Sequence, residues 1–155
     1  MSLDSVRAWL AEHAPDLPII DNGESTATVG LAAQALGVEP GRIAKTLAVR
    51  VRDEVFLLVA RGDARLDNAK TKAAFGGRPR MLGAEETLAL TGHPVGGVCP
   101  FGLATPLPVY CDESLRPYDE VFPAAGSLTS SVRVAPTRLA ELVSRGWVDV
   151  CTIKE

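Results

Sequence analysis

A glycine-rich and proline-rich run and a single lysine far upstream are the parts of this chain best suited to chemistry. The run extends from Pro94 to Gly102 (P-V-G-G-V-C-P-F-G), and the lysine is Lys45, within I-A-K-T-L. Three glycines and two prolines in nine residues exclude regular helix or strand interior, yet the run is apolar. Such a loop lets main-chain N–H groups approach a ligand closely, and a lysine cation can stabilise an oxyanion or bind a phosphate. A tight turn and a surface lysine are the structural alternatives.

A second cluster of small residues, Ala124 to Ser127, precedes Thr129, Ser130 and Ser131. Its glycine, Gly126, could let a backbone N–H approach a ligand, and the hydroxyls could position water or a ribose. A hydroxyl-rich turn between strands is an equally good interpretation.

One thiol and one imidazole near the first loop need a separate interpretation. Cys99 has no histidine at a spacing typical of cysteine nucleophiles, so we interpret it as a structural thiol. His93 precedes a proline at an expected helix end and is interpreted as a packing or capping residue.

Length and composition predict one domain over residues 1–155, long enough to bury a core. No apolar run approaches the roughly 18 residues that a membrane-spanning helix needs, and the N-terminus lacks the basic region of a secretory signal. Three cysteines and two histidines at unrelated spacings argue against a disulfide framework and a zinc site. We therefore expect a cytoplasmic protein without metal or cofactor.

The charge is unevenly distributed along the chain. Residues 1–39 carry a net charge of −5, residues 40–80 a net +6 and residues 81–155 a net −4, for −3 overall. The basic middle third permits a local polyanion-binding face, although the same residues could simply be solvated on the outside of helices and strands.

The expected elements alternate without strict βαβ order. Hydrophobic periodicity and capping residues predict helices over 3–14, 29–36, 68–75, 84–90 and 137–144, with Thr28 as the N-cap of the second. Strands are expected at 17–20, 46–51, 55–60, 107–111, 121–124, 131–134 and 147–150, the second and third of which form a hairpin. This order predicts an α+β fold with a mixed sheet.

The motifs, taken together and in order, resemble the YbaK/EbsC family. The resemblance rests on T-V-G-L-A-A-Q-A-L-G-V-E-P-G-R-I-A-K-T-L from Thr28, R-L-D from Arg65, the run Gly96–Gly102, L-P-V from Leu107 and A-G-S from Ala125. The members of that family are free-standing relatives of the editing domain inserted in bacterial prolyl-tRNA synthetases. The resemblance covers essentially the whole chain and implies a mixed, barrel-like sheet surrounded by helices. It also implies hydrolysis of the ester joining a wrongly attached amino acid to the 3′ end of tRNA.

The resemblance also assigns roles to individual residues. Lys45 matches the family's functional lysine, and Gly97 and Gly126 are the catalytic candidates in the two loops. The residues that it implies in substrate binding are Thr28, Gly96, Pro100, Phe101, Gly102, Ser127 and Ser130. Ser130 and Ser131 stand where many relatives have Asn or Asp, so the preferred amino acid stays open, and Phe101 is leucine or valine in some relatives.

The physical chemistry of the ester agrees with this implication. Aminoacyl esters are activated, so holding the ester beside water with donors aimed at the oxyanion can suffice, without metal or protein nucleophile. No residue of the sequence is an obvious proton acceptor, so the substrate's amine, side chain or ribose hydroxyl is our hypothesis.

The function that we expect is trans-editing of tRNA mischarged with a small amino acid such as alanine, cysteine, serine or threonine, on tRNA(Pro) or a related tRNA. The expected partner is the aminoacylated 3′ end of tRNA, with a synthetase as a second candidate; no membrane or DNA partner is expected, and the oligomeric state stays open. A non-catalytic tRNA- or synthetase-binding module is the alternative, and a hydrolase using Cys99 is a third, weaker one.

Overall fold

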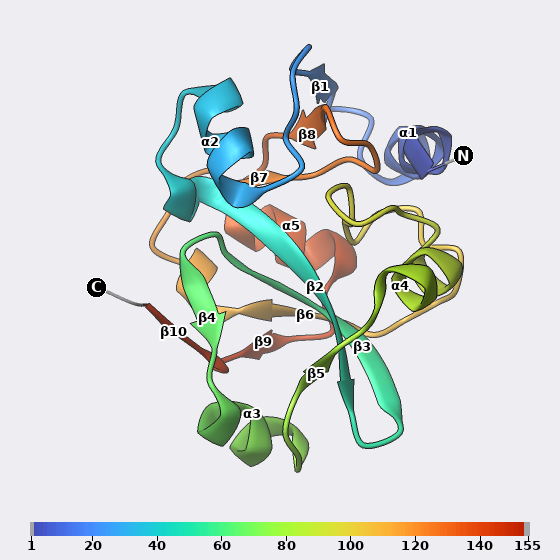
Figure 1. The fold of residues 1–155 in the computed structure, drawn as a ribbon. Helices are drawn as coiled ribbons and strands as arrows, with labels where there is room; N and C mark the ends of the chain where they lie inside the picture. Colours follow the sequence, from blue (N-terminus) through green and yellow to red (C-terminus); the bar gives the residue numbers. More distant parts are fainter. Residues whose placement is uncertain (1, 154–155) are drawn as a thin grey trace.

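The computed structural model describes residues 2–153 and has an α+β fold (Figure 1). The helices are α1 (Ser2–His13), α2 (Val29–Leu36), α3 (Asn68–Phe75), α4 (Ala84–Thr91) and α5 (Pro136–Val143), with 3₁₀ turns at Pro40–Arg42 and Glu113–Leu115. The strands are β1 (Ile19–Asp21), β2 (Ile43–Val51), β3 (Glu54–Arg61), β4 (Ala64–Leu66), β5 (Arg80–Met81), β6 (Val109–Asp112), β7 (Phe122–Pro123), β8 (Ser130–Val132), β9 (Trp147–Val148) and β10 (Cys151–Ile153).

The central sheet is mixed, as the sequence predicted. Its strand order is β5-β2-β3-β6-β9, and β7 pairs with β2. Strands β2 and β3 are antiparallel, whereas β6 runs parallel to both β3 and β9. Two separate pairs, β1 with β8 and β4 with β10, extend the structure beyond this sheet.

The predicted hairpin is the centre of the fold. Strands β2 and β3 pair along eight registered positions, from Ala44 opposite Arg61 to Val51 opposite Glu54. Because side chains alternate along a strand, one face of the hairpin carries Ala44 and Ala48 into the larger hydrophobic cluster. The other face carries Val49 and Val51 into a second cluster. The two faces of β2 therefore look into different parts of the molecule.

Two predicted helix caps are present at the predicted residues. The Thr28 hydroxyl accepts a hydrogen bond from the Leu31 amide at 3.1 Å, and Asp67 accepts one from the Lys70 amide at 2.9 Å. Helix α2 ends at Gly37, which adopts the left-handed φ of +68° that glycine tolerates. These local signals set the bounds of α2 and α3.

Three strands were not predicted from the sequence. Strand β5 is only two residues long, and β4 and β10 have three residues each and pair with one another. Such short strands form where tertiary contacts bring segments together, and no periodic pattern marks them. Strand β5 leads to the cleft described next, because Met81 lines that cleft.

Candidate functional site

A cleft of about 250 Å³ lies between α2, the edge of β2, the β5–α4 connection and the loop at residues 95–98. Its walls are mostly apolar, and Ala27, Met81 and Val95 are among them. Polar groups come from Lys45, Thr46 and other residues of the surrounding elements. A mostly apolar concavity with a few convergent polar groups is the usual form of a small-ligand site.

One edge of β2 is open where it borders the cleft. At one end of the strand, β7 pairs with Ile43 and Ala44, and at the other end β5 pairs with Val49 and Arg50. The Leu82 amide donates to the Ala48 carbonyl at 3.0 Å, which closes the β5 side. Within residues 2–153, no strand is registered between these two partners on that edge, so the backbone at Thr46 borders the cleft.

Thr46 is a site residue that the sequence reasoning missed. It lines the cleft, and its Oγ1 is buried without a hydrogen-bond partner among the described residues. An unpartnered buried hydroxyl costs about 1–3 kcal/mol, so its presence points to a partner supplied by a ligand. The signal was available in the alternation of β2, which puts Thr46 on the same face as Ala44 and Ala48, two small residues that leave room beside it.

Lys45 also lines the cleft, but its side chain lies on the opposite face of β2 from that of Thr46. Its Nζ donates a hydrogen bond to the Ala64 carbonyl of β4. Burial lowers the pKa of Lys45 from its ordinary value, because the charged form loses hydration; the neighbouring Cys151 and Asp63 favour the charged form. Lys45 therefore borders the cleft at the open edge of β2, while its Nζ is partly desolvated and held by the Ala64 carbonyl on the face away from Thr46.

In the first glycine loop, Gly96 borders the cleft and Gly97 does not. Gly96 has φ +95°, a conformation that favours glycine, and a Cβ there would lie 2.8 Å from the end of the flexible Leu128 side chain. The Gly97 amide donates to the Pro94 carbonyl at 2.9 Å and is already used. The amides of Gly96 and Val98 make no hydrogen bond within residues 2–153, and both residues line the cleft.

The rest of the first loop belongs to the core. Pro100 and Phe101 are buried, and the Phe101 ring packs 5.4 Å from that of Trp9 in α1. Gly102 lies directly against α1, since a Cβ there would be 2.5 Å from the Ser5 carbonyl oxygen. These three residues hold the loop in place and lie outside the cleft.

The second loop also packs against α1. Gly126 has φ +88°, and an added Cβ would lie 2.8 Å from the Ser2 carbonyl oxygen. Its amide donates to the Gly97 carbonyl at 3.1 Å, which ties the two loops together. Ser127 and Ser130 bond to one another through their hydroxyls at 2.6 Å, outside the cleft. Of this segment, Ala124 and Ser131 reach the cleft wall.

Thr28 has a local role and a place at the site. It lines the cleft, and its hydroxyl oxygen accepts the Leu31 amide as the N-cap of α2. Of the predicted site residues, the structure thus brings Thr28, Lys45 and Gly96 together at the cleft.

His93 and Cys99 form a buried pair behind the loop. His93 Nε2 donates to the Phe101 carbonyl at 2.7 Å, which places the proton of the neutral ring on Nε2; Nδ1 lies 2.6 Å from the Ser2 hydroxyl, whose single proton also faces the Gly126 carbonyl. Burial lowers the pKa of His93, which favours this neutral form. Burial also raises the pKa of the Cys99 thiol to about 12, so the thiolate needed for nucleophilic attack is scarce near neutral pH.

Two further properties concern metal binding and membrane insertion within residues 2–153. No group of three or more His, Cys, Asp or Glu side chains is arranged to hold a metal ion. None of the helices in this range has the length and apolar character to cross a bilayer.

Comparison with known proteins gives one family. Residues 23–142 match the family model described as "Aminoacyl-tRNA editing domain". The chain is 46% identical to the "Uncharacterized protein YwhH" of Bacillus subtilis over 153 residues, which covers 97% of this chain and 98% of YwhH.

Two other similarities carry functional names. The "Putative Cys-tRNA(Pro)/Cys-tRNA(Cys) deacylase EbsC" of Enterococcus faecalis is 30% identical over 122 residues, with 77% of this chain and 74% of EbsC covered. A crystal structure described as that of "a putative trans-editing enzyme for prolyl tRNA synthetase" superposes with a TM-score of 0.89 at 36% identity, over 97% of each chain.

Proposed function

Because this chain belongs to the aminoacyl-tRNA editing domain family, we propose that it hydrolyses the ester joining a wrongly attached small amino acid to the 3′ end of a tRNA. The observation that carries the proposal is the cleft, which is lined by Thr46, Gly96 and Val98; within residues 2–153 the Thr46 hydroxyl and the two loop amides make no hydrogen bond. These are neutral donors in a mostly apolar pocket, the arrangement that suits an ester whose carbonyl oxygen gains negative charge.

The proposal of a small acyl group is supported by the similarity to EbsC, whose name specifies Cys-tRNA. A space of about 250 Å³ is below the usual range of pockets for drug-sized molecules. Where the acyl subsite fits a small side chain, larger side chains are rejected by steric exclusion, which discriminates more sharply than affinity for a missing methylene. Alanine, cysteine, serine and threonine are the candidates.

In the reaction that we propose, water attacks the ester carbonyl while the cleft donors bind the oxygen that becomes negative. The donors are the Thr46 hydroxyl and the two loop amides, which need no reorganisation once the substrate is bound. The tetrahedral intermediate then collapses with loss of the ribose oxygen, which takes a proton to become the hydroxyl of the free tRNA end.

Lys45 supplies the positive charge of the site. Its ammonium is attached to the Ala64 carbonyl by one hydrogen bond, and its flexible four-carbon side chain lets it exchange that carbonyl for an anionic group of the substrate. Either the terminal phosphate or the oxyanion would fit this role.

The proton acceptor is expected to be a group of the substrate. Among the described residues that line the cleft there is no Asp, Glu or His, and Lys45 is the one titratable side chain. The attacking water then loses its proton to the substrate's amine or to the terminal ribose hydroxyl, a form of catalysis that positions the reactants and leaves proton transfer to them.

A panel of mischarged tRNAs tests the proposal. We expect the pure protein to release at least one small amino acid, and Lys45→Ala to slow release by at least about 100-fold, as expected for loss of a group that stabilises developing charge. Lys70→Ala is the matched control, because Lys70 pairs with Asp149 away from the cleft. Wild-type rates in Lys45→Ala on every tRNA would contradict the role of the lysine. Release from no tRNA, with tRNA still bound, would favour a non-catalytic binding module.

A further inference from the structure

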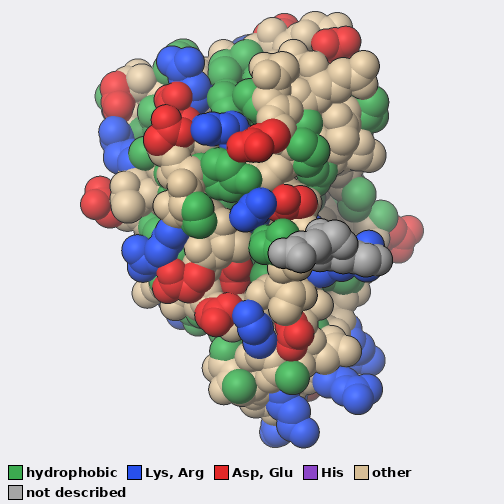
Figure 2. Space-filling model, turned by 90° about the vertical axis from the view of Figure 1, so that its left-hand side faces the viewer, with side chains coloured by type: hydrophobic (Ala, Val, Ile, Leu, Met, Phe, Trp, Pro, Cys, Tyr) green, Lys and Arg blue, Asp and Glu red, His purple; other side chains and the backbone are tan. Residues whose placement is uncertain are grey.

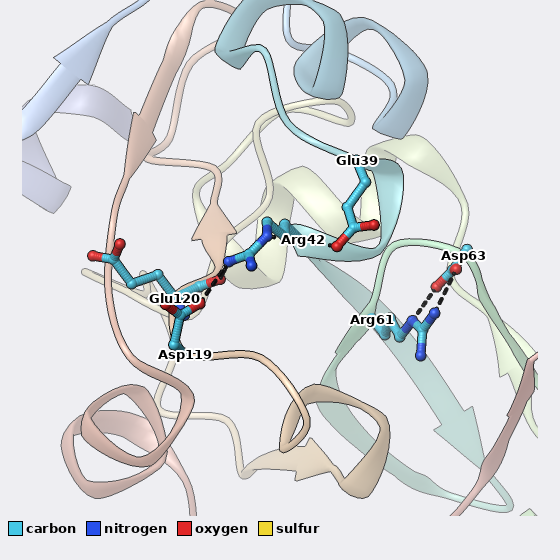
Figure 3. Close-up of polar contacts among 6 residues, drawn as sticks. All are labelled: Glu39, Arg42, Arg61, Asp63, Asp119 and Glu120. Atoms are coloured by element: carbon cyan, nitrogen blue, oxygen red, sulfur yellow. Dashed lines mark hydrogen bonds and ion pairs between the residues drawn. The ribbon is translucent and has the colours of Figure 1, made fainter.

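Seven of the ten basic side chains in the basic middle third of the chain fall into two groups in the folded protein. Arg42 pairs with Asp119 at 2.7 Å and with Glu39 at 3.6 Å, and Arg61 pairs with Asp63 at 2.6 Å (Figure 3). Arg50 makes a two-point contact with Glu86. These arginines are neutralised by their partners and are poorly available to an external anion.

The second group is unpaired and gathers at one end of the molecule. Its members are Arg52, Lys72, Arg78 and Arg80, which we call the basic end. All four are exposed, and none has an acidic side chain within 4.0 Å among the described residues.

The fold brings the four together around the turn after α3. Arg52, in the β2–β3 turn, donates from Nε to the Gly76 carbonyl at 3.0 Å. Lys72 lies one helical turn before Gly76, and Arg78 and Arg80 follow it on the way into β5. Figure 2 shows Lys and Arg side chains at the lower end of the molecule, where no Asp or Glu side chain is visible in that view. Asp53 and Glu54, in the turn next to Arg52, offset part of this charge.

The basic end is continuous with the cleft. Arg80 directly precedes Met81, and Met81 lines the cleft. In Figure 1 the β2–β3 turn, α3 and β5 lie at the lower end, whereas α1, β1 and α2 lie at the upper end. The upper elements belong to residues 1–39, which carry a net charge of −5. A long polyanion with one end in the cleft is therefore attracted towards the β2–β3 turn and α3, and is repelled by the acidic segment that contains α1, β1 and α2.

We propose that the basic end binds the phosphate backbone of an RNA duplex whose single-stranded 3′ tail enters the cleft. This inference rests on the proposed function and adds the direction in which the acceptor stem leaves the site, along β5 towards the turn after α3. Exposed arginines and lysines are suited to contacts with backbone phosphates. Such contacts do not depend on the base sequence; they supply affinity and set the orientation of the protein on the duplex.

The test measures binding apart from hydrolysis. The probe is an uncharged RNA hairpin with a single-stranded 3′ tail, titrated by fluorescence anisotropy over a series of salt concentrations. The variant is Arg78→Gln/Arg80→Gln, and the control is Arg7→Gln/Arg145→Gln, which removes the same charge at two other exposed arginines without ion pairs among residues 2–153.

We expect the Arg78/Arg80 variant to bind the hairpin at least about tenfold more weakly and to lower the slope of log K against log salt by about 1.4 to 1.8. The control should change affinity less than about twofold, since its arginines make no phosphate contact in this arrangement. Equal loss in both variants would overturn the inference, because it would show an effect of net charge alone. Unchanged RNA binding with lost binding to phosphatidylglycerol vesicles would overturn it in favour of a membrane surface.

A second measurement separates this inference from the proposed function. Hydrolysis of an aminoacylated 3′-end fragment without a duplex should be unchanged in Arg78→Gln/Arg80→Gln, whereas hydrolysis of the full aminoacyl-tRNA at low concentration should slow. If no substrate is hydrolysed by any form but hairpin binding still depends on Arg78 and Arg80, the proposed function fails and the RNA surface stands.

Discussion

Lys45 and Thr46 are neighbours in β2, and their side chains lie on opposite faces of the sheet. The Lys45 ammonium is bonded to the Ala64 carbonyl, while the Thr46 hydroxyl is buried beside the cleft without a partner among the described residues. Two adjacent residues thus bring a hydrogen-bonded amino group and a neutral hydroxyl to the same open strand edge, from opposite faces of the sheet. We expect substitution of Lys45 to remove a positive charge from the site, and substitution of Thr46 to remove only a neutral hydrogen-bond donor.

Replacing Thr46 by valine should separate activity from stability. Valine keeps the shape and removes the unpartnered hydroxyl, so the free energy of unfolding should stay the same or rise by about 1 kcal/mol. Deacylation should fall by about 100-fold if the hydroxyl donates to the transition state. Denaturant titration and single-turnover hydrolysis measure the two quantities. Thr46→Ser is the control and should keep most of the activity; a Thr46→Val protein with full activity would remove the hydroxyl from the mechanism.

Gly126→Ala should weaken the fold at the junction of the two loops with α1. An alanine at φ +88° is strained, and its Cβ would lie 2.8 Å from the Ser2 carbonyl oxygen, so we expect a loss of about 2–3 kcal/mol. The matched change Gly30→Ala is in α2, where a Cβ meets nothing within 4 Å, and should stabilise by about 0.5–1 kcal/mol. Equal midpoints of urea unfolding for the two variants would refute the packing argument.

His93 should make the protein less stable in weak acid. Burial lowers its pKa in the folded state below the ordinary 6.5, so the unfolded chain binds the proton first as the pH falls. The free energy of unfolding should therefore be unaffected by His93 above pH 6.5 and decrease below it, until the folded-state pKa is passed. His93→Gln should flatten this part of the curve. A wild-type curve that is already flat between pH 6.5 and 5 would show that the ring titrates normally.

The Cys99 thiol should be unreactive in the native protein and should take no part in deacylation. Its thiol is fully buried, and a pKa of about 12 leaves little thiolate at neutral pH, so a small alkylating reagent should label it only after unfolding. Cys99→Ala should keep deacylation near the wild-type rate and cost about 1–2 kcal/mol through the lost packing of the sulfur. Mass spectrometry of the labelled native protein gives the first result. A large loss of activity in a folded Cys99→Ala protein would bring back the thiol hydrolase.

The parts of the fold that were predictable have strong local signals. The hairpin has two alternating apolar runs around a polar turn, and Thr28 and Asp67 cap helices whose ends are marked by Gly37 and Gly76. The short strands β4, β5 and β10 have no such pattern, because their pairing depends on segments far apart in the sequence. The mixed sheet followed from the element order, but its open edge at Thr46 depends on where β5 and β7 end.

The site was predictable only in part for a related reason. Composition predicted that the backbone of the loop at 94–102 approaches a ligand closely, yet Gly97 and Gly102 lie against other parts of the protein. A glycine-rich pattern indicates that another group lies close to the backbone, but it does not show whether that group is a ligand or a helix of the same protein. Thr46 was missed because a threonine in a strand is ordinary, and only the tertiary structure shows that its hydroxyl has no partner within residues 2–153.

Helix α1 lies outside the region that matches the family, yet the two glycine loops depend on it for their position. The match to the family starts at residue 23, but the two loops rest on the first turns of α1, through Ser2 against Gly126 and Ser5 against Gly102. The same helix holds His93 through Ser2 and covers Phe101 with Trp9. The region matched by sequence similarity therefore leaves out the helix against which both loops pack. A chain shortened to that boundary would keep every residue of the cleft and lose the surface that sets the spacing of its loops.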